Sequence, residues 1–309
     1  AINGQRAASV NFLQDGAVNV NQFSSQIGQR VPLESVQEFS VISGGLSSEY
    51  GRASGGVVNV VTKSGTNQFH GTGFGFNRVS ALSSNSFDNK ANSLDKGVFT
   101  RNQYGYSIGG PAIKDKLLFF NSTEWTKVRS STPVISIVPS SELIAASAEA
   151  TRNYFGQFGL SSSLPSNNDD NASKLYTKAE IASLFPIVKG GAFDKIKSDT
   201  VVFGQVENRR AADAGGGDPQ NAMQSVVRLD YNYSNKETIT LRYGTDRQTL
   251  FDGTNSYSPY GGFNTGTQLQ NDNLSLSLTQ AHSSRLITQT RLAINRLKYE
   301  QPLGSAGST

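Results

Sequence analysis

The sequence predicts an all-β fold in which a small globular domain is followed by antiparallel strands of a membrane-spanning barrel wall, with helix as a minor element. Charged residues make up 17% of the 309 residues, and 31 residues are glycine, a balance typical of a β protein rich in turns. Near residue 70 a nearly continuous apolar run, VVNVVTK, gives way to a strict alternation of aromatic residues with glycine, HGTGFGFN. Similar alternating segments follow, and the connections between them alternate between long and short, as in outer-membrane barrels.

The composition excludes several classes of site. The net charge is +4, but Lys and Arg are scattered, so the clustered cations of a nucleic-acid surface are missing. There is no cysteine, and His70 and His282 stand apart from other candidate ligands, which argues against disulfides and metal sites. No apolar run approaches the roughly 20 residues of a membrane-spanning helix. Because the sequence begins at Ala1 within an ongoing pattern, we expect a fragment or a processed product.

The first 68 residues predict a small domain of short strands. Asp15-Gly16 separates two apolar segments and predicts a tight hairpin turn. Pro32 suits the first position of a short helix, and a strand is expected to follow from Phe39 to Ile42. The glycines between Tyr50 and Gly56 predict a loop with close backbone approaches. The run from Val57 to Val61 predicts a strand that is buried on both faces.

Seven later segments show the period-two alternation of barrel strands. In the first, Phe74 and Phe76 are expected on one face and the glycines on the other. Aromatic residues in these segments predict a girdle at the membrane interface, formed by Phe74, Phe76, Tyr104, Tyr106 and Trp125. The seven segments are 70–77, 102–109, 116–128, 227–233, 239–243, 274–279 and 286–297.

Three long connections are expected on the external side of the membrane and three short turns on the periplasmic side. The long ones are 79–101, 129–222 and 248–272, and the short ones are 110–115, 235–237 and 282–285. Residues 201–209 have strand character, but an additional crossing would break the alternation, so we place them within the longest external connection. The same connection predicts a helix from Pro139 to Phe158 and a second helix opened by a capping box of Thr177 and Glu180. Its acidic segments 169–171 and 213–218 favour solvated loops over calcium sites.

The segment from Pro32 to Gly71 resembles the end of the plug domain of TonB-dependent outer-membrane receptors, and within that family the Oar-like receptors. The matching residues are LESVQEF, SSEYGRASGGVVNVVTKSGTNQFHG and the hairpin signature GGPAIKDKLLFF of 109–120, and FLQDG is similar to an early plug strand and turn. The resemblance covers roughly residues 1–128. The chain departs from it in having Ile42-Ser43-Gly44-Gly45 where the wider family has an Arg-Gly-Pro turn, which favours the Oar-like subgroup. The family's N-terminal coupling box is absent from the sequence.

The resemblance implies a domain division and a function. Residues 1–68 would form the C-terminal part of the plug, and residues 69–309 would supply about seven of the 22 barrel strands of such transporters. It implies plug-gated uptake of an unidentified extracellular ligand, with outer-membrane lipid and a TonB-type periplasmic energy transducer as partners and no cofactor. The implied gating residues are Glu38, Glu49, Tyr50, Gly51, Arg52, Gly55, Gly56, Asn59, Thr62 and Lys63. Among them, Glu49 and Arg52 are expected either to form an ion-pair latch against the wall or to order the loop.

Other functions remain open on the sequence alone. Glu34 and Glu38 are four residues apart, but no His or Asp accompanies them, and the glycine-rich loop lacks the Gly-Lys-Ser/Thr ending of a phosphate loop. The sequence therefore predicts no enzyme. A protein for adhesion or for secretion of other proteins, with segment 129–222 as its working surface, is one alternative. A soluble β-sandwich or β-solenoid is the other.

Overall fold

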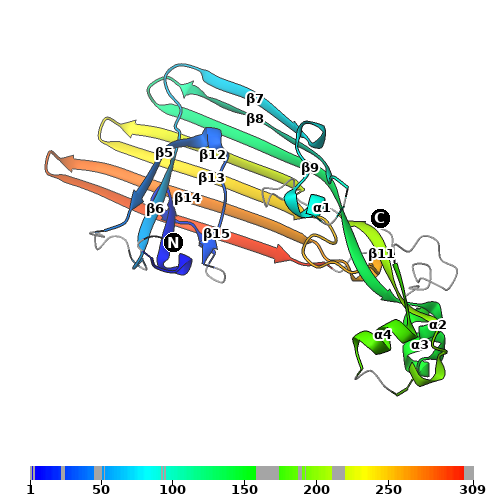
Figure 1. Ribbon diagram of the computed structural model, residues 1–309. Coiled ribbons are helices and arrows are strands. Elements are labelled where there is room, and N and C mark those ends of the chain that lie inside the picture. Colours follow the sequence, from blue (N-terminus) through cyan, green and yellow to red (C-terminus); the bar gives the residue numbers. More distant parts are fainter. Residues whose placement is uncertain are drawn as a thin grey trace.

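A computed structural model describes residues 2, 4–21, 25–44, 51, 53–91, 93, 95–157, 174–186, 190–191, 193–210 and 220–302. These residues form a small β domain, a large antiparallel sheet and a folded insertion at one end of that sheet (Figure 1). Within this part of the chain no helix is long and apolar enough to span a membrane.

The small domain is built around a sheet with strand order β2-β1-β6-β5, in which β6 runs parallel to β1 and antiparallel to β5. Asp15 and Gly16 have φ angles of 48° and 72° and close the β1–β2 hairpin, as predicted. Val57 and Val58 of β6 are buried, whereas its later valines are partly exposed, so double-sided burial holds for the first half of this strand. The elements are η1 (Ala7–Ser9), β1 (Val10–Gln14), β2 (Ala17–Val18), β3 (Val20–Asn21), β4 (Gln26–Ile27), η2 (Leu33–Ser35), β5 (Val36–Ile42) and β6 (Gly56–Thr62).

The large sheet contains all seven of the predicted wall strands, each paired antiparallel with its neighbour in the sequence-predicted order. Most of these strands extend several residues beyond the predicted segments, into what the sequence suggested were loops. Two of the three predicted short turns, after residues 234 and 283, are two residues long, and the third covers residues 114–116. The strands are β7 (His70–Val79), β8 (Val98–Ile113), β9 (Leu117–Pro139), β12 (Asn221–Ser234), β13 (Glu237–Leu250), β14 (Thr267–Ser283) and β15 (Leu286–Glu300).

The longest strand, β9, changes partner along its length. Its first part, up to Lys127, pairs with β12, whereas residues 132–139 pair with β11 (Val201–Arg210). The segment 201–209 is therefore a strand, but it continues the sheet beyond β12 and adds no crossing to the wall. β10 (Lys174–Thr177) pairs with the other edge of β11.

The insertion between β9 and β11 has a small core of its own. Phe193, Ile196 and Val202 are buried together, and Leu143 and Ile181 pack against them. The helix with its capping box at Thr177 is present as predicted, whereas the single helix predicted from Pro139 is two helices interrupted at Ser147 and Ala148, and Pro139 itself still belongs to β9. Together with the elements of the other connections, these helices are η3 (Ser80–Leu82), α1 (Phe87–Ala91), α2 (Ser141–Ala146), α3 (Glu149–Gln157), α4 (Lys178–Leu184), η5 (Phe193–Lys195) and η6 (Gly261–Phe263).

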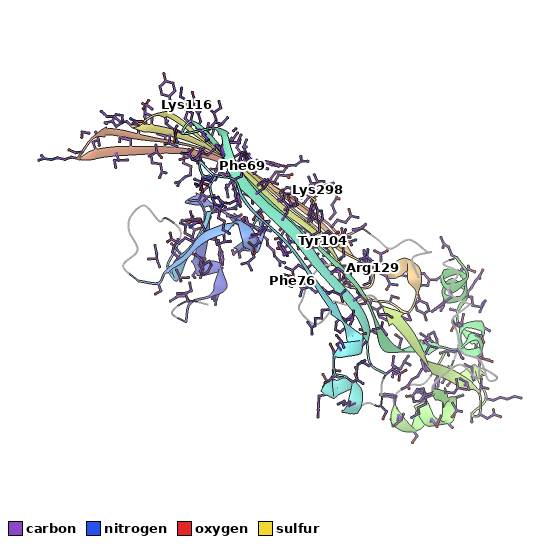
Figure 2. The ribbon with its side chains drawn as sticks, turned by 90° about the horizontal axis from the view of Figure 1, so that it is seen from above. Phe69, Phe76, Tyr104, Lys116, Arg129 and Lys298 are labelled. Carbon is purple, nitrogen blue, oxygen red and sulfur yellow. The ribbon has the colours of Figure 1, made fainter. Side chains whose placement is uncertain are left out.

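The small domain lies on one face of the large sheet, which we call the covered face, and leaves the outer face free (Figures 1 and 2). The register places polar residues of β12 to β14 on the covered face. Arg228 of β12 lies directly opposite Arg242 of β13, and Asn273 of β14 lies two residues from the position opposite Arg242. Aliphatic and aromatic residues occupy the outer face, where Val227, Tyr243 and Leu274 form one row across the three strands. This apolar outer surface is what a barrel wall presents to lipid.

Candidate functional site at the contact between the small domain and the large sheet

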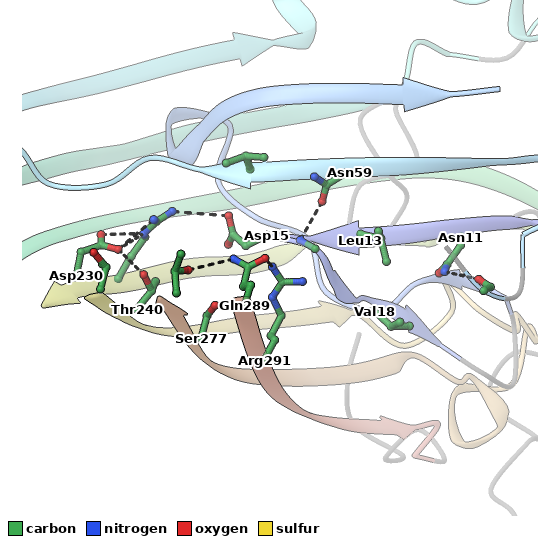
Figure 3. Close-up of a pocket in the computed structure, with 16 residues that line it drawn as sticks. Asn11, Leu13, Asp15, Val18, Asn59, Asp230, Thr240, Ser277, Gln289 and Arg291 are labelled. Atoms are coloured by element: carbon green, nitrogen blue, oxygen red, sulfur yellow. Dashed lines mark hydrogen bonds and ion pairs between the residues drawn. The ribbon is translucent and has the colours of Figure 1, made fainter. Parts of the chain in front are cut away.

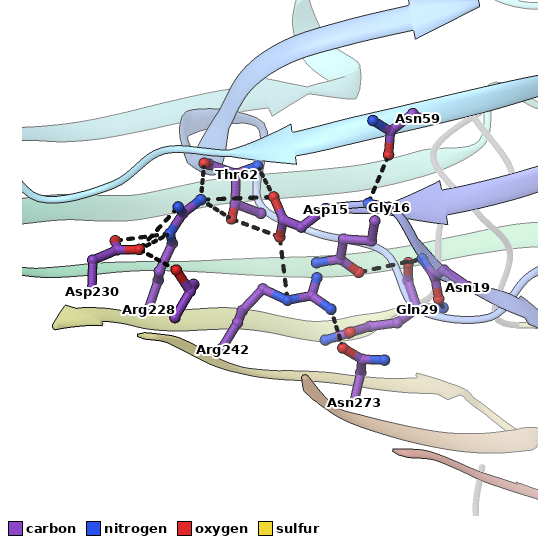
Figure 4. Close-up of polar contacts among 12 residues, drawn as sticks. Asp15, Gly16, Asn19, Gln29, Asn59, Thr62, Arg228, Asp230, Arg242 and Asn273 are labelled. Carbon is purple, nitrogen blue, oxygen red and sulfur yellow. Dashed lines mark hydrogen bonds and ion pairs between the residues drawn. The ribbon is translucent and has the colours of Figure 1, made fainter. Parts of the chain in front are cut away.

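Asp15 is the centre of the contact between the small domain and the large sheet. Its position in the tight β1–β2 turn directs the carboxylate toward the end of β6, where it accepts hydrogen bonds from the Thr62 backbone N at 2.7 Å and the Thr62 Oγ1 at 2.9 Å. The same carboxylate forms ion pairs with Arg242 of β13 at 3.3 Å and with Arg228 of β12 at 3.8 Å (Figure 4). One side chain thus connects two strands of the small domain with two strands of the wall.

Each arginine has further partners, as a charge removed from water requires. Arg228 donates to Asp230 from Nε at 2.9 Å and to the carbonyl oxygen of Thr62 from Nη1 at 2.8 Å. Arg242 is only 1% exposed and donates from Nη2 to Asn273 of β14. Because Arg228 binds Asp230 within its own strand, Asp15 is the acidic partner that is left for Arg242.

Hydrogen bonds extend the same contact across the sheet. The backbone N of Arg30 donates to Asp246 at 3.2 Å. The side chain of Asn271 donates to the carbonyl oxygen of Gly28, and that of Asn295 donates to the carbonyl oxygen of Val18 at 2.9 Å. The contact is therefore carried by charges and hydrogen bonds.

A cavity of about 780 Å³ lies beside Asp15, between β1 and β6 on one side and β12 to β15 on the other (Figure 3). Leu13 and Asn59 line it from the small domain, and Thr240, Ser277 and Arg291 line it from the wall. Hydroxyl and charged groups make the wall side polar, so water can occupy the space and reach the ion pairs.

Two of the gating residues expected from the sequence, Asn59 and Thr62, lie in this contact, whereas Lys63 and Gly56 have partners elsewhere. Thr62 binds Asp15 as described, and Asn59 accepts a hydrogen bond from the Gly16 backbone N at 3.1 Å. Lys63 forms a longer pair with Glu34 at 3.9 Å, in which both side chains are more than one-third exposed. Gly56 packs so closely on β5 that an added Cβ would lie 2.9 Å from the Ile42 carbonyl oxygen.

The other gating residues lie along β1 and β5 or are not described. Gly51 accepts a hydrogen bond from Asn11 and lines the cavity beside Asp15, and Gly55 donates to the Ser9 carbonyl oxygen, so both bind β1 or its entry. Glu38 lies on β5 and is exposed. Glu49, Tyr50 and Arg52 lie outside the described residues, so a latch built on Glu49 and Arg52 stays a prediction.

Sequence reasoning missed Asp15, Arg228 and Arg242 as site residues. Asp15 was predicted only as a turn residue, and the two arginines were given no role beyond their place in the predicted wall strands 227–233 and 239–243. The sequence did contain a usable signal. Two adjacent wall strands each carry an arginine on the polar face, and two such charges removed from water require an acidic partner from another element.

The predicted aromatic girdle is divided between the two faces of the sheet. Tyr104, Tyr106 and Trp125 share the outer face, and Tyr104 stacks on Trp125 with ring centroids 5.7 Å apart. Phe74 and Phe76 lie opposite Gly105 and Gln103 and therefore on the covered face, and Figure 2 shows Phe76 on that side of the sheet. Grouping these two phenylalanines with the outer aromatic residues is wrong, because in β7 the glycines and not the aromatic residues face outward.

No metal site emerges among the residues described. They contain no group of three or more His, Asp or Glu side chains that could hold a metal ion. The acidic segments 169–171 and 213–218 lie outside the described residues.

The chain has relatives among known proteins. Residues 61–309 match the sequence model of the outer membrane beta barrel domain family. The TonB-dependent transporter Oar of Myxococcus xanthus is 31% identical over 128 residues, which cover 39% of this chain and 12% of Oar. The probable TonB-dependent siderophore receptor PirA of Acinetobacter baumannii is 35% identical over 100 residues, which cover 30% of this chain and 12% of PirA. The matches thus cover about an eighth of the length of these two relatives.

Two solved structures share the fold. The siderophore receptor PirA from Pseudomonas aeruginosa aligns with 98% of this chain and 35% of its own length, at 14% identity and a TM-score of 0.52. A variant of the ferric enterobactin receptor PfeA from the same organism, in complex with enterobactin, aligns with 96% of this chain and 34% of its own length, at 13% identity and a TM-score of 0.51. At these identities the likeness concerns the fold alone.

The apolar outer face, the alternation of long connections with short turns, and these relatives all point to the same class. The soluble β-sandwich or β-solenoid alternative is therefore set aside. The chain belongs to the outer membrane beta barrel domain family, is located in the bacterial outer membrane, and is related to TonB-dependent receptors of the Oar-like kind.

Proposed function

We propose that the chain supplies the plug and the first wall strands of a TonB-dependent transporter that takes up an extracellular ligand when the plug is moved. In this proposal residues 1–68 belong to the plug and residues 69–309 to the wall and its external connections. The observation that carries the proposal is the contact at Asp15, where the small domain is attached to the wall by ion pairs and hydrogen bonds beside a polar cavity.

The chemistry of this contact suits an element that must move. A hydrogen bond between protein groups contributes only about 0.5–1.5 kcal/mol net, because water replaces the lost partner when the contact opens. An apolar contact of the same size would expose its whole surface to water on opening, at about 25 cal/mol per Å². A polar contact with water beside it therefore holds the plug in one position and still lets it be displaced at moderate cost.

The partners follow from the same proposal. Outer-membrane lipid contacts the apolar outer face of the wall. A TonB-type periplasmic protein supplies the pull through a segment joined to the plug on its N-terminal side. An extracellular ligand reaches the plug from the end of the wall that carries the long connections.

A reversible tether between plug and wall tests the proposal. Val18 of β2 and Asn295 of β15 are joined by a hydrogen bond, and the chain has no cysteine of its own. In the full-length protein, Val18→Cys with Asn295→Cys would be linked by a short cleavable bis-maleimide, and energy-dependent ligand uptake would be measured in cells. We expect uptake to stop on linking and to return on cleavage.

The control is the pair Ser234→Cys and Glu237→Cys, which sit opposite each other at the β12–β13 turn, so a link there joins two wall strands only. Uptake that continues unchanged through the plug-to-wall tether would contradict a moving plug.

The insertion supports a second candidate, namely adhesion or the secretion of other proteins. The described part of segment 140–203 has its own small core and is carried beyond the wall by β9 and β11, a form suited to contact with another macromolecule. Replacing residues 132–219 with a short Gly-Ser linker would leave the β9–β12 ladder intact. Loss of surface attachment or protein secretion with normal uptake would favour this second function.

A further inference from the structure

The part of β9 that carries the insertion has an unpaired edge. The pairing of β8 with β9 ends at Ser131, whereas β11 pairs with residues 132–139 from the other side. Figure 1 shows β9 and β11 continuing together beyond the wall toward the insertion. Among the described residues, no strand pairs with the β8 side of residues 132–139. An unpaired edge of this kind is a template for pairing with another strand.

The phase of the ladder shows which backbone groups this edge offers. The backbone N of Ser140 donates to the carbonyl oxygen of Val202 at 2.9 Å. Because residue pairs in an antiparallel ladder alternate between hydrogen-bonded and non-hydrogen-bonded pairs, the even-numbered residues of this part of β9 bond to β11. The backbone groups of Ile135 and Ile137 therefore point away from β11, into the unpaired edge.

The edge is bounded by proline and apolar in between. Pro133 and Pro139 have no N–H, and at these odd-numbered positions they remove donors from the unpaired edge without weakening the ladder with β11. Between them, Ile135 and Ile137 supply the backbone donors, and their side chains are 45% and 62% exposed. The edge thus combines backbone donors with an exposed apolar surface over the length of one short strand.

The sequence of this edge is its own reverse. Residues 133–139 read Pro-Val-Ile-Ser-Ile-Val-Pro, a palindrome centred on Ser136. When two such strands pair antiparallel about a two-fold axis at Ser136, every residue lies opposite an identical one. Ile135 then exchanges backbone hydrogen bonds with Ile137 of the other copy, and the reverse. Every N–H of the two edges is paired, and proline lies opposite proline, where neither has a donor to lose.

We propose that this edge of β9 pairs with the same edge of a second copy of the chain, so that the two insertions share one antiparallel sheet. The isoleucines of both copies would lie side by side on one face, which removes their exposed surface from water. The contact is isologous and closed, because the edge of each copy is covered by the other. This pairing does not depend on movement of the plug and goes beyond the proposed function.

A disulfide at the centre of the palindrome can trap the pairing. One strand per copy is a much smaller interface than stable complexes form, so the association should be transient. Ser136 and its counterpart would form a non-hydrogen-bonded pair with Cα atoms about 4.5 Å apart, which a disulfide can bridge. The chain contains no cysteine. The full-length Ser136→Cys protein, with no other cysteine, should therefore form a linked dimer when isolated outer membranes are mildly oxidised.

Two controls separate edge pairing from random collision. Ser198→Cys places the thiol at an exposed position of the same insertion and should give less than about a tenth of the dimer. Adding Ile135→Pro and Ile137→Pro to Ser136→Cys should lower the dimer yield about tenfold, because both donors toward the second copy are lost. Ile135→Thr with Ile137→Thr keeps these donors and should lower the yield only about twofold. Hydrogen exchange of residues 193–203 shows whether the insertion core stays folded in each variant.

A test of the register does not need the proline variant. Differently tagged Ile135→Cys and Ile137→Cys proteins, expressed together, should link to each other more readily than either links to itself, because only the mixed pair lies face to face in the two-fold register.

Three results would overturn the inference. The first is a dimer yield of Ser136→Cys no higher than that of Ser198→Cys; slow hydrogen exchange of Ile135 and Ile137 would then identify another segment of the same protein as the occupant of the edge. The second is an unchanged dimer yield in a folded proline variant, which would place the contact elsewhere than the edge backbone. The third is linking of the Ile135→Cys and Ile137→Cys proteins without preference for the mixed pair.

Discussion

The charge of Asp15 decides how firmly the small domain is held, because Arg242 is almost fully buried and has no other carboxylate within ion-pair distance among the described residues. Removing one partner of a buried pair costs about 3–5 kcal/mol. For Asp15→Asn we expect the free energy of unfolding of the small domain to fall by about 3 kcal/mol, the low end of this range, because Asp15 is partly solvent-accessible. The measurement is urea unfolding of the small domain in the full-length protein, reported by a fluorophore on Ser40→Cys.

A double-mutant cycle separates the ion pair from general damage. Arg242→Gln in the Asp15→Asn background removes the buried charge, so the double variant should be more stable than the sum of the single effects predicts. Glu34→Gln is the matched control, because the exposed Glu34–Lys63 pair should contribute only about 0–1 kcal/mol. Strictly additive effects of Asp15→Asn and Arg242→Gln would rule out a direct coupling.

Gly65, in the connection between β6 and β7, lies directly against the backbone of β9. A Cβ at this position would overlap the carbonyl oxygen of Phe119 and lie 2.7 Å from the Phe119 backbone N. Backbone cannot move aside as a flexible side chain can, so Gly65→Ala should destabilise the small domain by about 1–3 kcal/mol. Gly73→Ala is the comparison, because nothing lies within 4 Å of its Cβ position; an equal effect of the two changes would refute close approach as the cause.

The sequence predicted the residues that form local motifs better than the residues that form the site. Asp15-Gly16 was identified as a turn from two adjacent residues alone. Its partners Arg228 and Arg242 lie more than 200 residues away, and only the register of the sheet brings them to the turn. Phe74 and Phe76 show the same limit: a period of two assigns them to one face, but the pairing with β8 decides which face that is.

At the scale of elements, the capping box of α4 predicts a pH dependence. The backbone N and Oγ1 of Thr177 both donate to Glu180, and these bonds hold the pKa of that carboxyl below its ordinary value of 4.5. A lowered pKa in the folded state stabilises the helix above pH 4.5, and this contribution disappears as the pH falls through the lowered pKa. Hydrogen exchange of residues 174–184 should therefore be slower in the parent than in Glu180→Gln at pH 6, and the difference should vanish at low pH.

Thr177→Ala serves as the control for this pH dependence, because it removes the hydroxyl donor to Glu180 and keeps the backbone N donor, so it should reduce the difference between Glu180 and Gln without abolishing it. A difference between the parent and Glu180→Gln that stays constant down to the lowest pH would contradict the capping mechanism.

The order of the wall strands could be predicted from the sequence, but their lengths could not. The alternation of apolar and polar residues in a wall strand ends where the outer face of that strand no longer contacts lipid. The backbone hydrogen bonds between neighbouring strands continue beyond that point, into the aqueous region. β9 is the clearest case, since its predicted segment ended at residue 128 and the strand continues to Pro139 along β11. The core around Phe193 escaped prediction because Leu143 and Ile181, which pack against its buried residues, come from helices 50 and 12 residues earlier in the chain, and only the folding of the insertion brings them together.

At the scale of the whole molecule, the two sheets differ in how they are stabilised, and this difference predicts two separate unfolding steps. The wall strands are joined by long ladders, such as the pairing of β13 with β14 from Glu237 to Leu250, whereas the small domain is joined to the wall by scattered polar contacts beside a cavity. Urea competes for hydrogen bonds and solvates both peptide and apolar groups, so the small domain should unfold at the lower concentration. A fluorophore on Ser40→Cys would report this first step, and one on Ser283→Cys, in the last position of β14, would report the wall. Asp15→Asn should lower the midpoint of the first step only, and a single coincident transition at both positions would show instead that the plug and the wall unfold as one unit.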